Sequence, residues 1–307
     1  MKKILVTGSN GLLGSAVVRK LEEQSDVQII KHSRKECDLM DREKTIEYFS
    51  SFKQIDSVIH CAAEVGGVLK NSLYSERMFY NNLKLNNNVI DSCYKMKVPN
   101  LVNILSTCLF PESANYPLTP DQIFSGDPHS SSFGYALAKR ISYLTVQSYR
   151  KALGYNWISI IPTNIYGIND NFNLENSHVL PALIMKAYTA KQTNKDFIIW
   201  GNGETHRQFI FSDDLAALIL WAKDNWHEDS PFMAVNSKEY LIKDVAILIA
   251  KKFEIPDDKI KFDFTKPSGI KRMTASSNAD QFQFTPLEEG LNKTIDWFKK
   301  EYNNIRK

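Results

Sequence analysis

The chain has few cysteines, no long hydrophobic run and little net charge. The cysteines are Cys37, Cys61, Cys93 and Cys108. They form no CxxC pair and have no metal-type spacing, which is typical of a protein in a reducing compartment. No apolar run reaches the roughly 18 residues of a membrane span, and the N-terminal apolar stretch is too short for a signal peptide. The sequence therefore predicts a cytoplasmic protein without a metal site and without membrane contact.

The charge balance argues against a nucleic-acid partner. Lys and Arg total 38, Asp and Glu total 35, and the basic residues are spread along the chain rather than clustered. A mildly basic pocket for an anionic ligand remains compatible with this balance. Because 307 residues exceed the roughly 100–200 of one ordinary domain, we expect one large domain or two coupled ones.

The N-terminal region combines a short apolar run with regularly spaced glycines. Ile4–Val6 leads into Gly8-Ser9-Asn10-Gly11-Leu12-Leu13-Gly14, and a helical pattern continues to Leu21. A strand, a glycine-rich turn and a helix in this order let backbone N–H groups approach a pyrophosphate at the positive end of the helix. The spacing GxxGxxG predicts a dinucleotide site at residues 8–14; a tight turn without a ligand is the alternative.

The residues after the second predicted strand favour a 2′-phosphate. An NAD site usually has Asp or Glu at the end of that strand, whereas Val27–Ile30 is followed by Lys31-His32-Ser33-Arg34-Lys35. We therefore predict NADP(H) as the cofactor, with a solvated loop of charges as the alternative. Asp38 precedes a predicted helix at about 41–52, where a carboxylate can face the adenine.

The next two predicted strands end in residues suited to a binding site. Ile55–Ala63 ends in small side chains, which let a flat ligand lie close to the backbone, and Gly66-Gly67 continues this open segment. A long predicted helix at about 74–97 carries Asn82 as an interior polar anchor. The strand at 101–105 ends at Ser106-Thr107-Cys108, which places a hydroxyl and a thiol at its carboxyl end.

A further predicted helix, at 133–154, carries Tyr135 and Lys139 on one face. An ammonium beside a phenol favours phenolate, so we expect Lys139 to lower the pKa of Tyr135 toward the working range of an acid catalyst. A YxxxK spacing alone is common on helix surfaces. Its position after a serine-ended strand, in a chain that begins with a glycine-rich turn, favours a catalytic role.

The alternation of strands and helices predicts an α/β fold with a doubly wound, Rossmann-type parallel sheet. After Pro162 the pattern changes: residues 197–210 resemble a hairpin, and 212–226 a helix that returns to the first domain. We predict an NADP-binding domain at 1–165 plus 209–236. A smaller α/β substrate domain would comprise 166–208 plus 237–307.

These residues together resemble the extended short-chain dehydrogenase/reductase family over essentially the whole chain. The closest similarity is to a branch of bifunctional enzymes that epimerise C3 and C5 and reduce C4 of a GDP-linked 4-keto-6-deoxy sugar. The matching segments are Val65–Gly67, Ser106–Cys108, Phe110-Pro111, Tyr135 with Lys139, Pro162–Gly167, Asp170–Phe172, Ser177–Pro181, Trp200-Gly201 and Arg207–Phe209. The Ser-Thr-Cys turn and residues 163–179 are specific to this branch.

The resemblance implies a role for each catalytic residue. Cys108 as base and His178 as acid would invert C3 and C5, whose hydrogens are acidic beside a ketone. Hydride from NADPH would then reduce C4, with Tyr135 as proton donor, Lys139 as its support and Ser106 bonded to the oxygen. Without the resemblance, Cys108 would be interpreted as a small buried apolar residue and His178 as a helix cap.

The resemblance also implies contacts with cofactor, substrate and a second subunit. Beyond the glycine-rich turn, NADP(H) would contact Arg34, Asp38, Ala62, Ala63, Asn82, Leu105, Thr107, Tyr135, Lys139, Pro162, Asn164, Ile165 and His178. The GDP-sugar would contact Lys186, Trp200, Arg207 and Arg272, since cations suit a diphosphate and an aromatic face suits guanine. For Lys186, an exposed helical lysine is the alternative. Family members pair through two helices per subunit, so a homodimer is expected.

The chain departs from the family pattern at three positions. Asn10 stands where a basic residue is common, so the 2′-phosphate would depend mainly on Arg34. Ser268 and Met273 replace an aspartate and a lysine, which leaves the exact sugar and nucleotide open. The expected reaction converts GDP-4-keto-6-deoxy-D-mannose to GDP-L-fucose. The alternatives are C4 reduction of another nucleotide-linked 4-keto-6-deoxy sugar or heptose, and a non-catalytic dinucleotide sensor.

Overall fold

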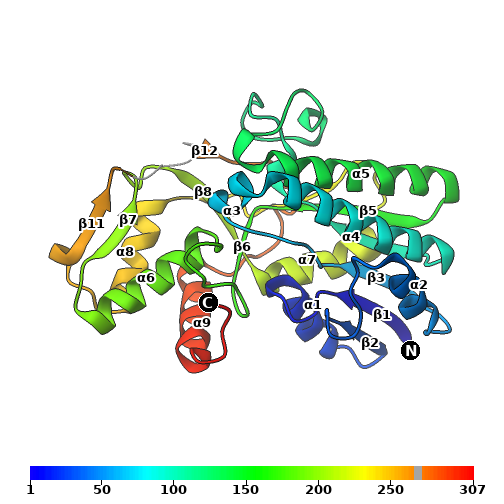
Figure 1. Cartoon of the computed structure of the whole chain (residues 1–307), viewed down its shortest axis with the longest axis horizontal. Helices are drawn as coiled ribbons and strands as arrows, with labels where there is room; N and C mark the ends of the chain where they lie inside the picture. The colour runs from blue at the N-terminus through cyan, green and yellow to red at the C-terminus, as the bar shows by residue number, and fades with distance from the viewer. Residues whose placement is uncertain (266–271) are drawn as a thin grey trace.

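A six-stranded parallel sheet forms the larger lobe of the molecule (Figure 1). The computed structural model describes residues 1–265 and 272–307, so Ser268 lies outside the described residues. The strand order is β2-β1-β3-β4-β5-β9, and each neighbouring pair is parallel. The strands are β1 (Lys2–Thr7), β2 (Val27–His32), β3 (Ser57–His60), β4 (Asn100–Ile104), β5 (Asn156–Pro162) and β9 (Phe232–Ala234). The predicted doubly wound α/β sheet is confirmed.

Helices cover both faces of this sheet because its strands are apolar on both sides. In β1, Ile4 and Val6 pack on the face covered by α1 (Leu12–Glu22) and α7 (Ser212–Asn225). Leu5 between them packs on the opposite face. That face is covered by α2 (Arg42–Ser50), α4 (Ser75–Lys95) and α5 (Phe133–Leu153). The short helix α3 (Val68–Leu73) precedes α4.

The smaller lobe contains two small sheets and three helices around its own core. One sheet joins β8 (His206–Phe211) to β6 (Asn164–Tyr166), β10 (Glu239–Leu241) and β12 (Arg272–Met273), and the other pairs β7 (Phe197–Trp200) with β11 (Ile260–Asp263). The helices are α6 (Val179–Thr193), α8 (Ile242–Lys252) and α9 (Leu287–Glu301). Short 3-10 turns lie at Thr107–Leu109, Pro120–Gln122, Ser130–Ser132 and Asp257–Lys259. None of the described helices is both long and apolar enough to span a membrane.

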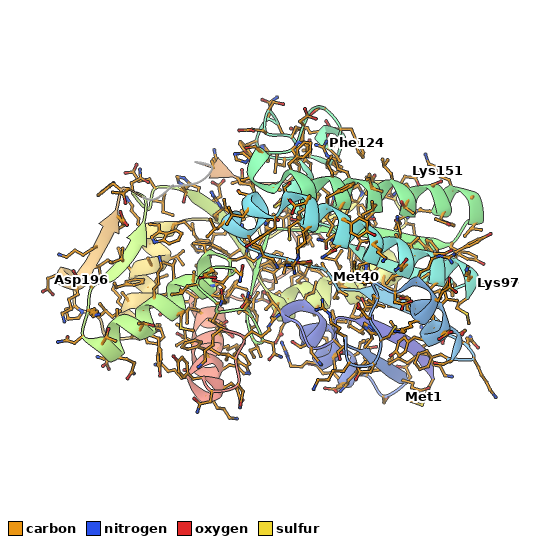
Figure 2. All side chains as sticks on the ribbon, viewed as in Figure 1. Met1, Met40, Lys97, Phe124, Lys151 and Asp196 are labelled. Atoms are coloured by element: carbon orange, nitrogen blue, oxygen red, sulfur yellow. The ribbon has the colours of Figure 1, made fainter. Side chains whose placement is uncertain are left out.

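The hairpin predicted at 197–210 is wrong. β7 pairs with β11, whereas β8 pairs with β6, β10 and β12. Backbone groups in the turn between β7 and β8 bond to other segments rather than across the turn. Gly201 N donates to Asp263 O at 2.9 Å, and Gly203 O accepts from Lys243 N at 2.9 Å. Figure 2 places Asp196, just before β7, at the end of the smaller lobe far from the main sheet.

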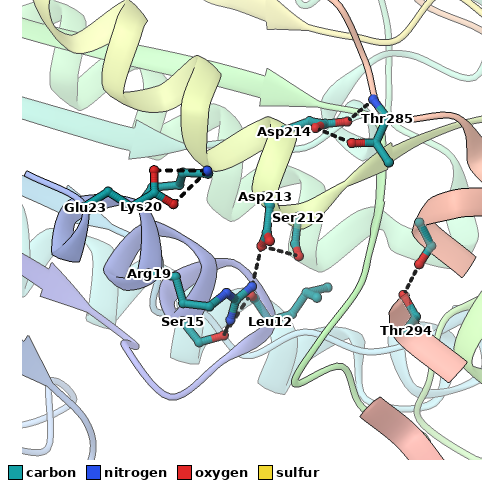
Figure 3. A network of polar contacts seen from close by, with 11 residues as sticks. Leu12, Ser15, Arg19, Lys20, Glu23, Ser212, Asp213, Asp214, Thr285 and Thr294 are labelled. Carbon is teal, nitrogen blue, oxygen red and sulfur yellow. Dashed lines mark hydrogen bonds and ion pairs between the residues drawn. The ribbon is translucent and has the colours of Figure 1, made fainter. Parts of the chain in front are cut away.

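The chain crosses back to the larger lobe near its C-terminus. Ala279, Phe282 and Phe284 pack with the α1–α7 side of the main sheet, although they fall within the range 237–307 predicted for the smaller domain. The domain boundaries themselves stay a prediction. Asp214 at the start of α7 accepts hydrogen bonds from Thr285 N and Oγ1, both at 2.8 Å (Figure 3). These contacts join the start of α7 in the larger lobe to the segment that leads into α9 in the smaller lobe.

Candidate active site

The glycine-rich turn between β1 and α1 lies where the strand order reverses: β2 follows on one side of β1, and β3 follows on the other. β1 pairs with both β2 and β3, and such a switch point is the usual dinucleotide site of an open α/β sheet. Gly8 has a φ of +66°, and a Cβ there would lie 2.9 Å from Ala62 Cα. A Cβ on Gly14 would overlap Gly8 O. No side chain caps α1 at Gly11, so its first N–H groups are available to a phosphate.

A buried polar chain supports Ala62, which sequence reasoning identified only as a small residue. Ala62 N donates to Thr7 Oγ1 at 3.2 Å, and Thr7 Oγ1 donates to His60 Nδ1 at 2.7 Å. His60 Nε2 donates to Asn86 Oδ1 at 3.1 Å, a tautomer assigned from these partners. Burial lowers the pKa of His60 to about 3, so its ring is neutral and accepts at Nδ1. A histidine inside an otherwise apolar strand was the available sequence signal.

Asn82 holds the segment that follows β3. Its side chain is fully enclosed; Oδ1 accepts from Glu64 N at 3.0 Å, and Nδ2 donates to Glu64 O at 2.9 Å and Met78 O at 2.8 Å. The prediction of an interior anchor is confirmed. The predicted contact of Asn82 with the cofactor stays a prediction; in the structure its amide holds the backbone of Glu64.

The residues around Arg34 present charge to solvent beside the glycine-rich turn. Ser9 N and Oγ donate to His32 O at 2.9 and 3.0 Å, which ties the turn to the end of β2. Lys31 pairs with Glu22 at 2.7 Å, whereas Arg34 is exposed and makes no ion pair within residues 1–265 or 272–307. Its guanidinium, like the exposed ammonium of Lys35 beside it, is thus available to a 2′-phosphate. Asp38, also exposed, accepts from Met40 N at 3.1 Å.

The other predicted cofactor residues lie at the carboxyl ends of β3, β4 and β5. Ala63 is half-buried, Leu105 and Thr107 are buried, and Pro162 is buried at the end of β5. Asn164 Nδ2 donates to Gln208 O at 2.8 Å, and Ile165 packs beside it in β6. These residues line the edge of the main sheet where the chain passes to the smaller lobe.

Contacts between β4 and α5 gather Ser106, Cys108, Tyr135 and Lys139. Ser106 Oγ accepts from Cys108 N at 3.2 Å and starts the 3-10 turn. Lys139 is buried and its Nζ donates to Ile104 O at 2.7 Å, which fixes α5 against the end of β4. The same Nζ lies 5.8 Å from the Tyr135 ring centroid. Ser106, Cys108 and Tyr135 are each half-buried, so a substrate can reach them.

The expected effect of Lys139 on Tyr135 is wrong. Burial raises the pKa of the Tyr135 phenol, and the negative charge of a Cys108 thiolate nearby raises it further. Burial also lowers the pKa of Lys139 to about 8, which reduces the charge that would favour phenolate. Tyr135 is therefore held as a neutral phenol, the form that can donate a proton to a carbonyl oxygen.

His178 begins α6 but does not cap it with its side chain. The capping alternative is therefore excluded. His178 is exposed to solvent, but the protein atoms around its imidazole partly desolvate the ring, and this desolvation lowers the pKa of His178. The backbone just before it meets the segment after β3, since Gly67 N donates to Asn176 O at 3.0 Å. The segment just before His178 in the smaller lobe thus lies against the segment that follows β3, and the role of His178 in the site stays a prediction.

The predicted substrate residues divide into three locations. Lys186 Nζ lies 4.2 Å above the centre of the Trp200 ring and donates to Ile198 O at 3.3 Å. Arg207, half-buried on β8, donates to His206 O at 2.7 Å. Burial lowers the pKa of Arg207, and the nearby Tyr116 phenol opposes this change. Arg272 makes a two-pronged ion pair with Glu239 at 2.9 and 2.6 Å, which it would have to leave to contact a phosphate.

A glycine-rich turn at the switch point, with Ser106 after β4 and with Tyr135 and Lys139 on α5, is typical of a dinucleotide-dependent carbonyl reductase of the short-chain dehydrogenase type. The model of the NAD dependent epimerase/dehydratase family matches residues 4–236. The chain belongs to this family.

Known relatives are similar over the full length. A GDP-L-fucose synthase of Dictyostelium discoideum is 38% identical, covering 100% of this chain and 98% of the relative. A GDP-L-fucose synthetase structure from Naegleria fowleri, bound to NADP, is 36% identical with a TM-score of 0.93, covering 100% of this chain and 95% of that one. A GDP-6-OMe-4-keto-L-xylo-heptose reductase from C. jejuni is 25% identical with a TM-score of 0.89, covering 98% of each chain.

Proposed function

We propose that this protein is an NADPH-dependent 3,5-epimerase and 4-reductase that converts GDP-4-keto-6-deoxy-D-mannose to GDP-L-fucose. The observation that carries the proposal is the thiol of Cys108: its backbone N–H donates to Ser106 Oγ, and a thiolate at this position raises the pKa of the Tyr135 phenol. A carbonyl reductase needs only the hydroxyl and the phenol, so the thiol indicates a second, proton-transfer reaction. The similar GDP-L-fucose synthases support the sugar, and the NADP-bound structure supports the cofactor.

The nucleotide end of the site fits NADP(H). Side chains at Gly8 and Gly14 would collide with Ala62 and with Gly8 O, so glycine at both positions permits the tight turn. That turn leads into the uncapped start of α1, whose N–H groups suit a pyrophosphate. Arg34 would hold the 2′-phosphate, and the bound cofactor supplies hydride to C4. As the C4 carbonyl becomes an alcohol, Tyr135 gives its phenolic proton to the oxygen while Ser106 donates a hydrogen bond. Lys139, fixed on Ile104 O, supports the resulting phenolate.

The epimerase reaction precedes reduction and uses the same oxyanion contacts. Cys108 as thiolate removes the proton from C3 or C5, and the electron pair moves into an enolate whose oxygen is held by Tyr135 and Ser106. His178, in its protonated form, returns a proton to the carbon from the opposite face, which inverts the centre. Each inversion leaves the carbon skeleton and redox state unchanged, so one NADPH is consumed per sugar.

We further propose that the larger lobe binds NADP(H), and that Lys186, Trp200 and Arg207 bind the GDP moiety in the smaller lobe. A cytoplasmic homodimer is proposed through α4 and α5, which lie side by side at one edge of Figure 1. Their outer faces expose Tyr80, Tyr94 and Leu144, large apolar side chains that a second copy would cover.

Two variants test the bifunctional assignment. Cys108→Ser should bind NADPH normally but lose deuterium uptake from D2O at C3 and C5. A serine hydroxyl is too weak an acid to lose its proton near neutral pH, so it cannot form the base. Tyr135→Phe should lose reduction but keep the uptake at a reduced rate, because Ser106 still holds the enolate oxygen. Cys93→Ala, on α4 away from the predicted site residues, is the matched control and should retain both activities. Full uptake in Cys108→Ser would contradict the epimerase role.

A C4 reductase acting on a heptose is the second candidate, and the likeness to the C. jejuni reductase favours it. In that case the wild-type protein would oxidise NADPH with a GDP-4-keto-heptose and would give little turnover with GDP-4-keto-6-deoxy-D-mannose. A direct comparison of kcat/KM for the two sugars decides between them.

A further inference from the structure

Gly67 lies in a tight contact between the two lobes, and its backbone conformation does not by itself require a glycine. Its φ of −67° and ψ of 179° are open to any residue. What requires glycine is space, because a Cβ at this position would lie 2.6 Å from Ser177 O. That distance is about 0.8 Å short of the 3.4 Å at which ordinary contact begins. The carbonyl belongs to the residue immediately before His178.

We infer that Gly67 is a positioning residue for His178, and that it matters for inversion at C3 and C5 but not for hydride transfer. The inference rests on the proposed function. The Gly67 N–H donates to Asn176 O at 3.0 Å, so the contact combines a hydrogen bond with close backbone approach. Because His178 follows directly and starts α6, a displacement at Asn176-Ser177 moves the imidazole.

The Gly67 side of this contact is rigid. Asn71 Nδ2 donates to Gly66 O at 2.7 Å and Gly67 O at 3.1 Å, which fixes both peptide groups at the start of α3. Glu64, three residues earlier, is held by the buried Asn82 and pairs with Lys70 at 3.1 Å. A side chain at Gly67 would therefore displace the opposing segment rather than its own.

The opposing segment is a surface turn that depends on Asn173. Asn173 Oδ1 accepts from Glu175 N at 3.0 Å and Asn176 N at 3.1 Å, and its backbone oxygen accepts from Ser177 N at 2.8 Å. Gly67 and Asn173 thus hold the residues before His178 from two sides. Removing either support should have the same selective effect, since Ser106, Tyr135 and Lys139 come from β4 and α5 and do not depend on this turn.

Inversion and hydride transfer can be measured separately. Inversion is followed by NMR as appearance of the 3,5-inverted 4-keto sugar from GDP-4-keto-6-deoxy-D-mannose with NADP+ bound. Hydride transfer is followed as the initial rate of NADP+ reduction by GDP-L-fucose. Deuterium exchange without inversion can occur through Cys108 alone, so inversion is the readout specific to His178.

Gly67→Ala should slow inversion by about 10- to 100-fold, because a misplacement approaching 1 Å can cost about 100-fold in rate. Hydride transfer at saturating cofactor should change by less than about twofold if the shift is confined to the turn. Gly66→Ala is the control, since the three atoms nearest to its Cβ, at 2.5–3.0 Å, belong to Lys70 on α3 and not to the turn before His178. Asn173→Ala should reproduce the selective loss, and it decides the matter if Gly67→Ala does not fold.

Parallel loss of both activities in the folded variants, or unchanged inversion, would overturn the positioning role. Failure of the proposed function is distinguishable, because the wild-type protein itself would then show no inversion of this sugar.

Discussion

Replacing Thr7 with valine tests the buried chain that supports the nucleotide turn. Thr7 is fully buried, and its hydroxyl accepts from Ala62 N at 3.2 Å and donates to His60 Nδ1 at 2.7 Å. Valine has nearly the same shape, so Thr7→Val removes these two hydrogen bonds with little change in packing. Thr7→Ser is the matched control, because it keeps the hydroxyl and removes one methyl group.

The expected loss follows from the two groups left without partners. A buried donor or acceptor that loses its partner costs about 1–3 kcal/mol, so Ala62 N and His60 Nδ1 together should cost about 2–6 kcal/mol of unfolding free energy. Loss of the methyl group in Thr7→Ser should cost about 1 kcal/mol. Since Ala62 abuts Gly8, Thr7→Val should also weaken NADPH binding, although Thr7 cannot itself touch a ligand.

Urea unfolding measures the difference directly. Thr7→Val should lower the transition midpoint more than Thr7→Ser, with the slope m unchanged if the variants unfold from the same compact state. NADPH titration by fluorescence gives the second readout. A Thr7→Val protein that is as stable as Thr7→Ser, and binds NADPH equally well, would show that the chain Thr7–His60–Asn86 does not support the turn.

Three further predictions concern cofactor choice and pH. Arg34→Ala should weaken NADPH binding by about 10-fold or more while leaving NADH nearly unchanged, since one charge-assisted hydrogen bond contributes about 1.5–3 kcal/mol; equal weakening would refute the 2′-phosphate contact. Gly14→Ala should abolish binding of both cofactors, which titration will show, because its Cβ would overlap Gly8 O. Burial lowers the pKa of His60 to about 3 and raises that of Asp170 to about 7. Between pH 7 and 5, His60 takes up a proton in the unfolded chain but stays neutral in the folded protein, so acidification lowers the free energy of unfolding. Asp170 takes up a proton in the folded protein but stays ionised in the unfolded chain, so acidification raises the free energy of unfolding. The two effects offset in the wild type, whereas Asp170→Asn should lose about 2 kcal/mol on acidification, and a flat profile by urea unfolding would contradict the His60 assignment.

The main sheet was predictable from sequence because its signals are local. Ile4–Val6, the glycines at 8, 11 and 14, and the alternating helices each fit within a short window, and parallel strands buried on both faces have continuous apolar runs. The relation of Tyr135 to Lys139 was likewise fixed by helical spacing. The site residues beyond these depended on the family resemblance and remain predictions until tested.

Features that depend on distant partners were not predictable. β8 pairs with strands from 164–166, 239–241 and 272–273, and nothing within 197–210 distinguishes this from a hairpin. The pKa of Tyr135 follows from burial by the whole fold, which overrides the nearby ammonium. The contact of Gly67 with Ser177 joins residues 110 positions apart, and the sequence around either one gives no sign of it.

The most direct test of the account is the reaction of the wild-type protein with GDP-4-keto-6-deoxy-D-mannose and NADPH in D2O. We predict GDP-L-fucose that carries deuterium at both C3 and C5, with one NADPH oxidised per product molecule. A reduced product with hydrogen at those carbons would contradict the bifunctional mechanism, and absence of NADPH oxidation would contradict the proposed substrate.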